Sequence, residues 1–211
     1  MDPDRSWQVV EQQRLAIAEL LAGLTDEQWA APSLCAGWRV RDVAAHLTLV
    51  SIPPSPGSLL ADLVRGRGSF HTLNTLAARR RAERSPARLV ADLRDSAASR
   101  QVPVVSNWRN VLFDVMVHGQ DIAIPLGLDL PVPADAAAAA ATRVWELGWP
   151  FRAKRRLRGL RLTATDVPWS VGEGDPVEGP IVAMLLLVTG RTATAAPLLT
   201  GAGVPRLAAR A

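Results

Sequence analysis

Apolar side chains recur at helical spacing through about the first 150 residues, and this pattern limits the fold more than any other feature of the chain. Prolines and glycines interrupt it, as they do at helix ends. Thr25 and Gln28 have the spacing of a capping box, which predicts a short helix there. This part of the chain should form a helical bundle. Longer helices are expected over residues 6–22, 40–50, 69–84, 85–99, 107–124 and 134–147, with a long connection over 51–68.

The pattern changes after residue 150. Residues 160–165 alternate apolar and polar side chains, which is typical of a strand, and Trp169 and Val171 continue this signal after Asp166. Gly179-Pro180 should open an apolar helix that ends near Thr189. A small α+β region is therefore expected after the bundle. Turns are predicted at Gly172, at Gly174 and at Asp175-Pro176.

Composition excludes several classes of protein. The chain has 211 residues, of which 48% are hydrophobic and 21% charged, so it can bury the core of one ordinary domain with a small appendage. Disordered, fibrous and disulfide-scaffold proteins are excluded. The apolar stretch at 181–188 is too short to cross a bilayer. The first residues lack the basic and apolar runs of a signal peptide, so we expect a cytoplasmic protein.

The charged residues give weak evidence for a nucleic-acid partner, and none is expected. The net charge is only +4, and every basic residue except Lys154 is arginine. Arginine also serves anionic small molecules, because its planar fork matches carboxylates. The basic runs at 79–88 and 152–158 are expected to be solvated faces. Cys35 is the only cysteine, which excludes an internal disulfide, and we expect it to be a buried apolar side chain.

Two of the three histidines lie within apolar helical segments. Asp114 precedes His118 by four residues, so the two side chains project from one helix face. Two explanations remain open. The Asp–His pair is an internal hydrogen bond, or it binds a divalent metal together with His46 from another helix, as helical bundles commonly do. The third histidine, His71, follows a polar stretch and is expected at the surface.

Two further aspartates are spaced so that they can reach these histidines. Asp121 follows His118 by three residues, and Asp42 precedes His46 by four. Carboxylates in such positions orient the imidazoles that ligate metals. The alternative is an ordinary helix-surface aspartate at position 42 and a helix-end hydrogen bond at position 121. No phosphate-binding loop, dinucleotide fingerprint, nucleophile elbow or HExxH motif is present, so no catalytic or cofactor-binding residue is assigned.

Three stretches resemble the mycothiol-dependent maleylpyruvate isomerase family, which belongs to the DinB-like group of helical-bundle metalloenzymes. The segment from Leu24 to Leu47 resembles its N-terminal signature, and Asp114–Ile122 resembles its acid-x-x-x-His segment. Residues 160–191 are similar to its C-terminal region. The resemblance implies a mainly α fold: a DinB-like four-helix bundle over residues 1–150, followed by a small α+β region over 151–211.

Carried over by position, the family's metal ligands are His46, Asp114 and His118, the residues that the spacing already singles out. The resembled pattern has glutamate where this chain has Asp114. The resemblance implies a divalent metal, with zinc expected, and mycothiol as thiol cofactor. It implies an isomerase or thiol transferase acting on a small anionic electrophile, without a membrane partner, and it allows a homodimer. The alternatives are a non-enzymic, metal-stabilised bundle that binds or regulates through a small molecule, and a DNA-binding helical protein.

Overall fold

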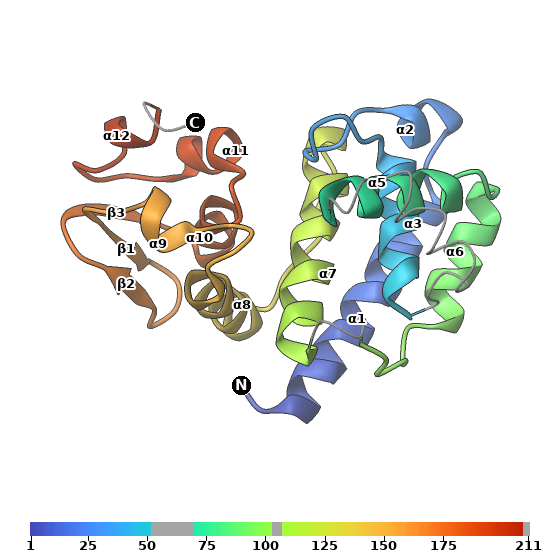
Figure 1. Cartoon of the computed structure of the whole chain (residues 1–211), viewed down its shortest axis with the longest axis horizontal. Helices are drawn as coiled ribbons and strands as arrows, with labels where there is room; N and C mark the ends of the chain where they lie inside the picture. The colour runs from blue at the N-terminus through green and yellow to red at the C-terminus, as the bar shows by residue number, and fades with distance from the viewer. Residues whose placement is uncertain (52–69, 103–106, 209–211) are drawn as a thin grey trace.

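Helices α1, α3, α6 and α7 lie alongside one another in the N-terminal part of the molecule (Figure 1). The computed structural model describes residues 1–51, 70–102 and 107–208. Helices α1 and α3 each pack against both α6 and α7, which closes the bundle. The expected four-helix bundle is confirmed. Its helices are α1 (Pro3–Ala22), α3 (Val40–Ser51), α6 (Pro86–Asp95) and α7 (Trp108–Ala123), and α2 (Asp26–Ala30) and α5 (Phe70–Arg81) pack beside α3.

Local sequence signals set the helix ends. The capping box of Thr25 and Gln28 is present, and Ser85 caps α6 with Pro86 at its first position. Helix α6 ends at Asp95, earlier than the expected residue 99. The physical reason is Arg14 of α1, whose Nη1 donates to the carbonyl oxygens of Ser96, Ala97 and Ser99 at 2.8–3.3 Å. The predicted connection over 51–68 lies almost entirely outside the described residues.

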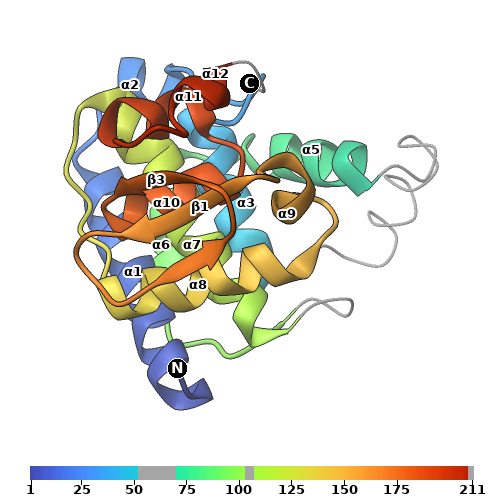
Figure 2. The ribbon, with the colours of Figure 1, turned by 90° about the vertical axis from the view of Figure 1, so that its left-hand side faces the viewer.

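The C-terminal part is a small sheet backed by helices. The strands lie in the order β2-β1-β3, with β1 antiparallel to β2 and parallel to β3. Helix α10 packs on β1 and on α8, and Figure 2 shows it behind the sheet. The elements are α8 (Ala134–Leu147), α9 (Ala153–Arg156), β1 (Leu160–Ala164), β2 (Ser170–Gly172), β3 (Asp175–Gly179), α10 (Ile181–Val188), α11 (Thr192–Ala195) and α12 (Pro205–Ala208), with 3₁₀ turns at Ile124–Leu126 and Ala196–Leu198.

Two of the predicted turns are wrong. Gly172 is the last residue of strand β2 and pairs with Arg161 of β1. Asp175 and Pro176 begin strand β3, where Asp175 pairs with Leu160 and Pro176 with Arg161. Strand β3 ends the strand order, and an edge strand tolerates the missing N–H of proline. The turn signal of Asp-Pro was therefore overridden by the pairing with β1.

Helix α8 connects the two parts of the molecule, because it packs against α7 on one side and α10 on the other. The division of the chain at residue 150 stays a prediction. Within the described ranges, no helix is long and apolar enough for a bilayer span.

The basic run at 79–88 is only partly the solvated face that was expected. Asp92 of α6 is buried, with its side chain 1% exposed, and it lies within ion-pair distance of Arg81, Arg84 and Arg88. The closest of these contacts joins Arg84 Nη1 to Asp92 Oδ2 at 2.5 Å. A buried carboxylate needs such partners, so these arginines stabilise the packing of α6.

Candidate metal centre

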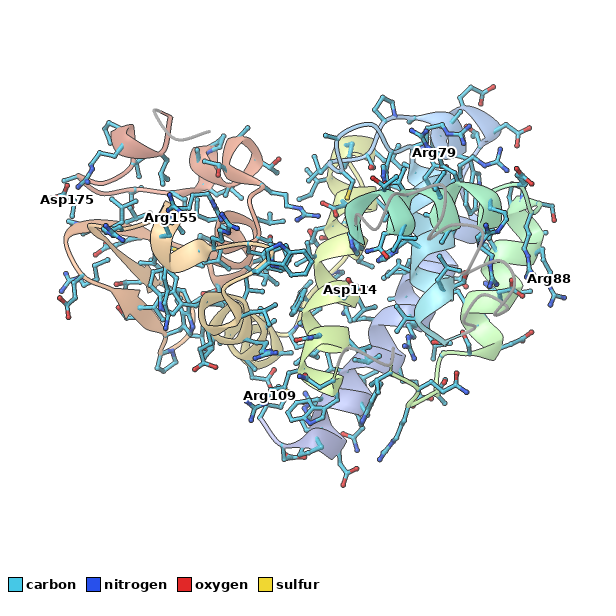
Figure 3. The ribbon with its side chains drawn as sticks, viewed as in Figure 1. Arg79, Arg88, Arg109, Asp114, Arg155 and Asp175 are labelled. Atoms are coloured by element: carbon cyan, nitrogen blue, oxygen red, sulfur yellow. The ribbon has the colours of Figure 1, made fainter. Side chains whose placement is uncertain are left out.

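The structure brings His46, Asp114 and His118 together between α3 and α7. One ligand atom from each lies within 4.8 Å of the others. The distance from Nε2 of His46 to Oδ2 of Asp114 is 3.7 Å, and that from Nε2 of His118 to Oδ1 of Asp114 is 3.5 Å. The imidazole rings cross edge to face with centroids 4.8 Å apart. Figure 3 shows Asp114 midway along α7.

These distances fit ligands of one cation better than hydrogen bonds. A nitrogen–oxygen hydrogen bond normally measures about 2.9 Å. Ligand atoms that lie about 2.1 Å from a tetrahedral ion are about 3.4 Å from one another. The three side chains are 14–25% exposed, so the site is partly buried and still reachable from solvent.

The charges around His118 favour a cation. Burial would raise the pKa of Asp114, but the nearby His118 and His46 imidazoles outweigh burial and lower it. Burial would lower the pKa of His118, but Asp114 and Asp121 raise it well above the ordinary value. Two carboxylates therefore face one imidazole, which is a place where positive charge is stabilised.

Asp121 lies behind His118, as the sequence spacing allowed. Its Oδ2 atom is 2.8 Å from Nδ1 of His118, and the Asp121 side chain is fully buried. An imidazole that donates from Nδ1 presents the lone pair of Nε2 on the opposite side, toward Asp114. This is the arrangement in which a carboxylate orients a ligating histidine.

Asp42 does not play the corresponding part for His46. Its carboxylate accepts hydrogen bonds from the backbone N–H of Arg39 at 2.9 Å and from the Arg39 guanidinium at 3.0 Å. Asp42 is also 2% exposed, so the alternative of a helix-surface aspartate is wrong as well. Nδ1 of His46 is buried and has no hydrogen-bond partner among the described residues.

Two residues near the site were not predicted to be there. Arg191, from the loop after α10, donates from Nε to Oδ1 of Asp121 at 2.9 Å and from Nη2 to Oδ2 at 2.5 Å. Cys35 donates its thiol hydrogen to Oδ2 of Asp121 at 3.0 Å and is only half-buried. Cys35 also packs against the hydrophobic core, so the expectation of a buried apolar side chain is met only in part. Arg191 stands 70 residues beyond Asp121, and no local pattern connects positions so far apart.

Cys35, His118 and Asp121 form a second group that could hold a cation. The guanidinium of Arg191 already contacts Asp121, and its Nη2 lies 3.5 Å from the sulfur of Cys35. Because this positive charge already neutralises Asp121, the group of His46, Asp114 and His118 is the better candidate.

Two arginines of the helical part that could serve an anionic ligand make other contacts. The guanidinium of Arg109 stacks over the Trp108 ring at 5.2 Å, and Figure 3 shows Arg109 near the N-terminal end of α7, away from Asp114. Arg79 donates to the carbonyl oxygen of Gly37. The side chain of His71 lies outside the described part of the structure.

Comparison with known proteins adds to this geometry. Residues 10–105 match the family model described as the mycothiol maleylpyruvate isomerase N-terminal domain. This part of the chain, slightly less than half of its length, is similar to that family. The match includes His46 and ends before α7, so it does not reach Asp114 or His118. No curated protein matches the chain.

Two solved structures extend the likeness beyond the N-terminal domain. A crystal structure of mycothiol-dependent maleylpyruvate isomerase has a TM-score of 0.55 and 15% sequence identity, and the match covers 96% of this chain and 93% of that one. A histidine-to-alanine mutant of that isomerase gives a TM-score of 0.54 at the same identity and coverage. At this identity the likeness shows a shared fold, which includes α7 and the C-terminal part.

Proposed function

We propose that this protein is a metal- and mycothiol-dependent enzyme that acts on a small anionic electrophile. The observation that carries the proposal is the convergence of His46, Asp114 and His118. The N-terminal domain family and the shared fold support mycothiol as the thiol and a cis–trans isomerisation or a thiol transfer as the reaction. Within this proposal the protein works in the cytoplasm on small molecules, not on nucleic acid.

The donor set fits a divalent ion. Two imidazole nitrogens and one carboxylate oxygen are ligands that zinc accepts, and three protein ligands leave a position open, as catalytic sites do. His46, Asp114 and His118 would hold the ion, and zinc is the expected metal. When bound, a divalent ion lowers the pKa of a coordinating thiol and so supplies a thiolate near neutral pH.

The chain's own residues prepare this site. Asp121 fixes the ring of His118, and Arg191 neutralises Asp121 inside the protein. Arg191 also donates from Nη1 to the carbonyl oxygen of Thr189 at 2.9 Å, so its hydrogen bonds serve the protein itself. In this structure Arg191 therefore acts as a support for the site.

The proposal is tested by turnover of maleylpyruvate and a panel of other electrophiles by the zinc-loaded protein, with and without mycothiol. We expect turnover that requires the thiol and that falls at least about a hundredfold in Asp114→Ala, since outer-shell changes alone often cost 10–100-fold. Asp135→Ala is the matched control, because Asp135 is exposed on α8 and should keep full activity. Bound metal without thiol-dependent turnover on any substrate would instead support the non-enzymic, small-molecule binding alternative.

A further inference from the structure

The C-terminal part contains a surface cavity of about 890 Å³ that is widely open to solvent and lined largely by arginine. The arginines come from three places: the segment before α9, α9 with the turn after it, and α12. Among the residues that the structure describes, no acidic side chain lines the cavity. Its principal lining residues are Phe151, Arg152, Arg155, Arg156, Arg158 and Arg206.

Two of these arginines hold the walls of the cavity in place. Nη2 of Arg156 donates to the carbonyl oxygens of Leu187 and Val188 at 2.9 Å, at the C-terminal end of α10. Nη1 of Arg206 donates to the carbonyl oxygen of Gly159 at 3.0 Å and pairs with Asp175. Their charges are thus offset by protein groups.

Arg152 and Arg155 are different. Both are exposed, and in the described ranges no ion pair or side-chain hydrogen bond includes either of them. The neighbouring Phe151 packs edge to face on Phe113 of α7, with ring centroids 5.5 Å apart, which fixes this wall of the cavity against the bundle. Figure 3 shows Arg155 on the C-terminal part, apart from Asp114 on α7. Arg152 and Arg155 are therefore solvated, as expected of the basic run at 152–158, whereas Arg156 is half-buried.

We propose that this cavity binds a small organic anion with two or more carboxylate or phosphate groups. Guanidinium forks match such groups bidentately, and Arg152 and Arg155 offer two of them in one hollow. The ring of Phe151 adds an apolar surface for the carbon skeleton. The volume is large enough for a small organic anion, and the open side leaves part of such an anion in contact with solvent. The site shares no residue with the candidate metal centre and does not depend on the function proposed above.

Titration calorimetry of the full chain with succinate, 3-phosphoglycerate and inorganic phosphate tests this site. We expect saturable binding of at least one of the two organic anions, at least about fivefold tighter than inorganic phosphate, and weakened by added salt. Arg152→Gln/Arg155→Gln should lower that affinity at least about tenfold, the loss of roughly one charge-assisted contact. His46→Ala should leave it unchanged.

The matched control is Lys154→Gln/Arg161→Gln. This control also removes two positive charges, but from exposed positions on α9 and β1 that do not line the cavity. It should change the affinity less than twofold. In NMR spectra of the unmutated protein, arginine Nε resonances should shift as the organic anion is added. This measurement does not depend on whether a variant folds. The proposal is overturned if neither organic anion binds saturably, or if the control variant loses as much affinity as the cavity variant. It is also overturned if the unmutated protein binds duplex DNA instead and the cavity variant loses that binding.

Discussion

Arg191 and Asp121 form a double hydrogen bond that joins the C-terminal part of the molecule to the bundle. Nε and Nη2 of Arg191 reach Oδ1 and Oδ2 of Asp121 at 2.9 and 2.5 Å. Oδ2 of Asp121 also lies 2.8 Å from Nδ1 of His118. All three candidate metal ligands belong to the bundle, yet one of them is oriented through a residue of the C-terminal part. The two parts are therefore coupled at the candidate metal centre.

Replacing Asp121 by asparagine should weaken zinc binding about 10–100-fold while the three ligands stay in place. Asparagine keeps the size of the side chain but loses the negative charge that orients and polarises His118. Zinc affinity is measured by competition with a chromophoric chelator. The control is Asp129→Asn, which changes an exposed aspartate beyond the end of α7. Equal affinity in a folded Asp121→Asn protein would show that Asp121 does not support the site.

Replacing Arg191 by glutamine should reduce the free energy of unfolding by about 3 kcal/mol, because it leaves a buried carboxylate without its charged partner. It should also lower zinc affinity, since Asp121 is then held less firmly against His118. Urea unfolding and chelator competition measure the two effects. In the double variant with Asp121→Asn, the losses should be clearly less than additive. Additive losses would mean that the two residues act independently.

Most helices and the candidate ligands could be predicted from sequence because both depend on local spacing. The helical period places Asp114 and His118 on one face of α7, and this relation survives in the structure. His46 was predicted as the third ligand because it lies in an apolar helical segment and because the chain resembles the isomerase family. The convergence of all three still needed the packing of α3 on α7, which no local pattern contains.

The errors come from contacts that compete with the predicted ones, some of them between residues far apart in the sequence. Asp175-Pro176 reads as a turn, but pairing with β1 makes it a strand. Asp42 has suitable spacing to His46, but Arg39 is closer and offers a charged fork. Arg191 has no local relation to Asp121. Competing partners of this kind can be recognised only once the chain is folded.

Substituting either histidine ligand should empty the metal site. We expect about one zinc ion per chain in the unmutated protein, and a strong fall in His46→Ala and in His118→Ala, because two remaining ligands hold zinc poorly. Inductively coupled plasma spectrometry after dialysis gives the metal content, and circular dichroism confirms the helical fold. Full occupancy in His46→Ala would remove His46 from the site.

Asp42→Asn should destabilise the fold without affecting metal content. The change weakens the contacts of a buried carboxylate with Arg39 and should cost about 1–3 kcal/mol of unfolding free energy at pH 7. Burial would raise the pKa of Asp42, but the hydrogen bonds and charge of Arg39 outweigh burial and lower it. Its stabilising effect is therefore present above the pKa of an unfolded aspartate and is lost as the pH falls through the lower, folded value.

Urea unfolding at several pH values tests whether the stabilising effect of Asp42 is lost as the pH falls. The difference in stability between the unmutated protein and Asp42→Asn should shrink as the solution becomes strongly acidic. Arg39→Gln should also lower the free energy of unfolding at pH 7. A loss of zinc in Asp42→Asn would restore the hypothesis that Asp42 supports His46.

The strongest test of the metal centre compares two substitutions of Asp114. Asp114→Glu keeps the charge and the ligand type and restores the residue of the resembled pattern, so it should retain zinc and keep thiol-dependent turnover within about tenfold. Asp114→Ala removes a ligand, and turnover should fall at least about a hundredfold together with metal content. Metal analysis and turnover are measured on the same preparations. If Asp114 acted as a general base instead, both substitutions would lower the rate while zinc stayed bound. Loss of activity in parallel with loss of zinc, confined to Asp114→Ala, is what a ligand predicts.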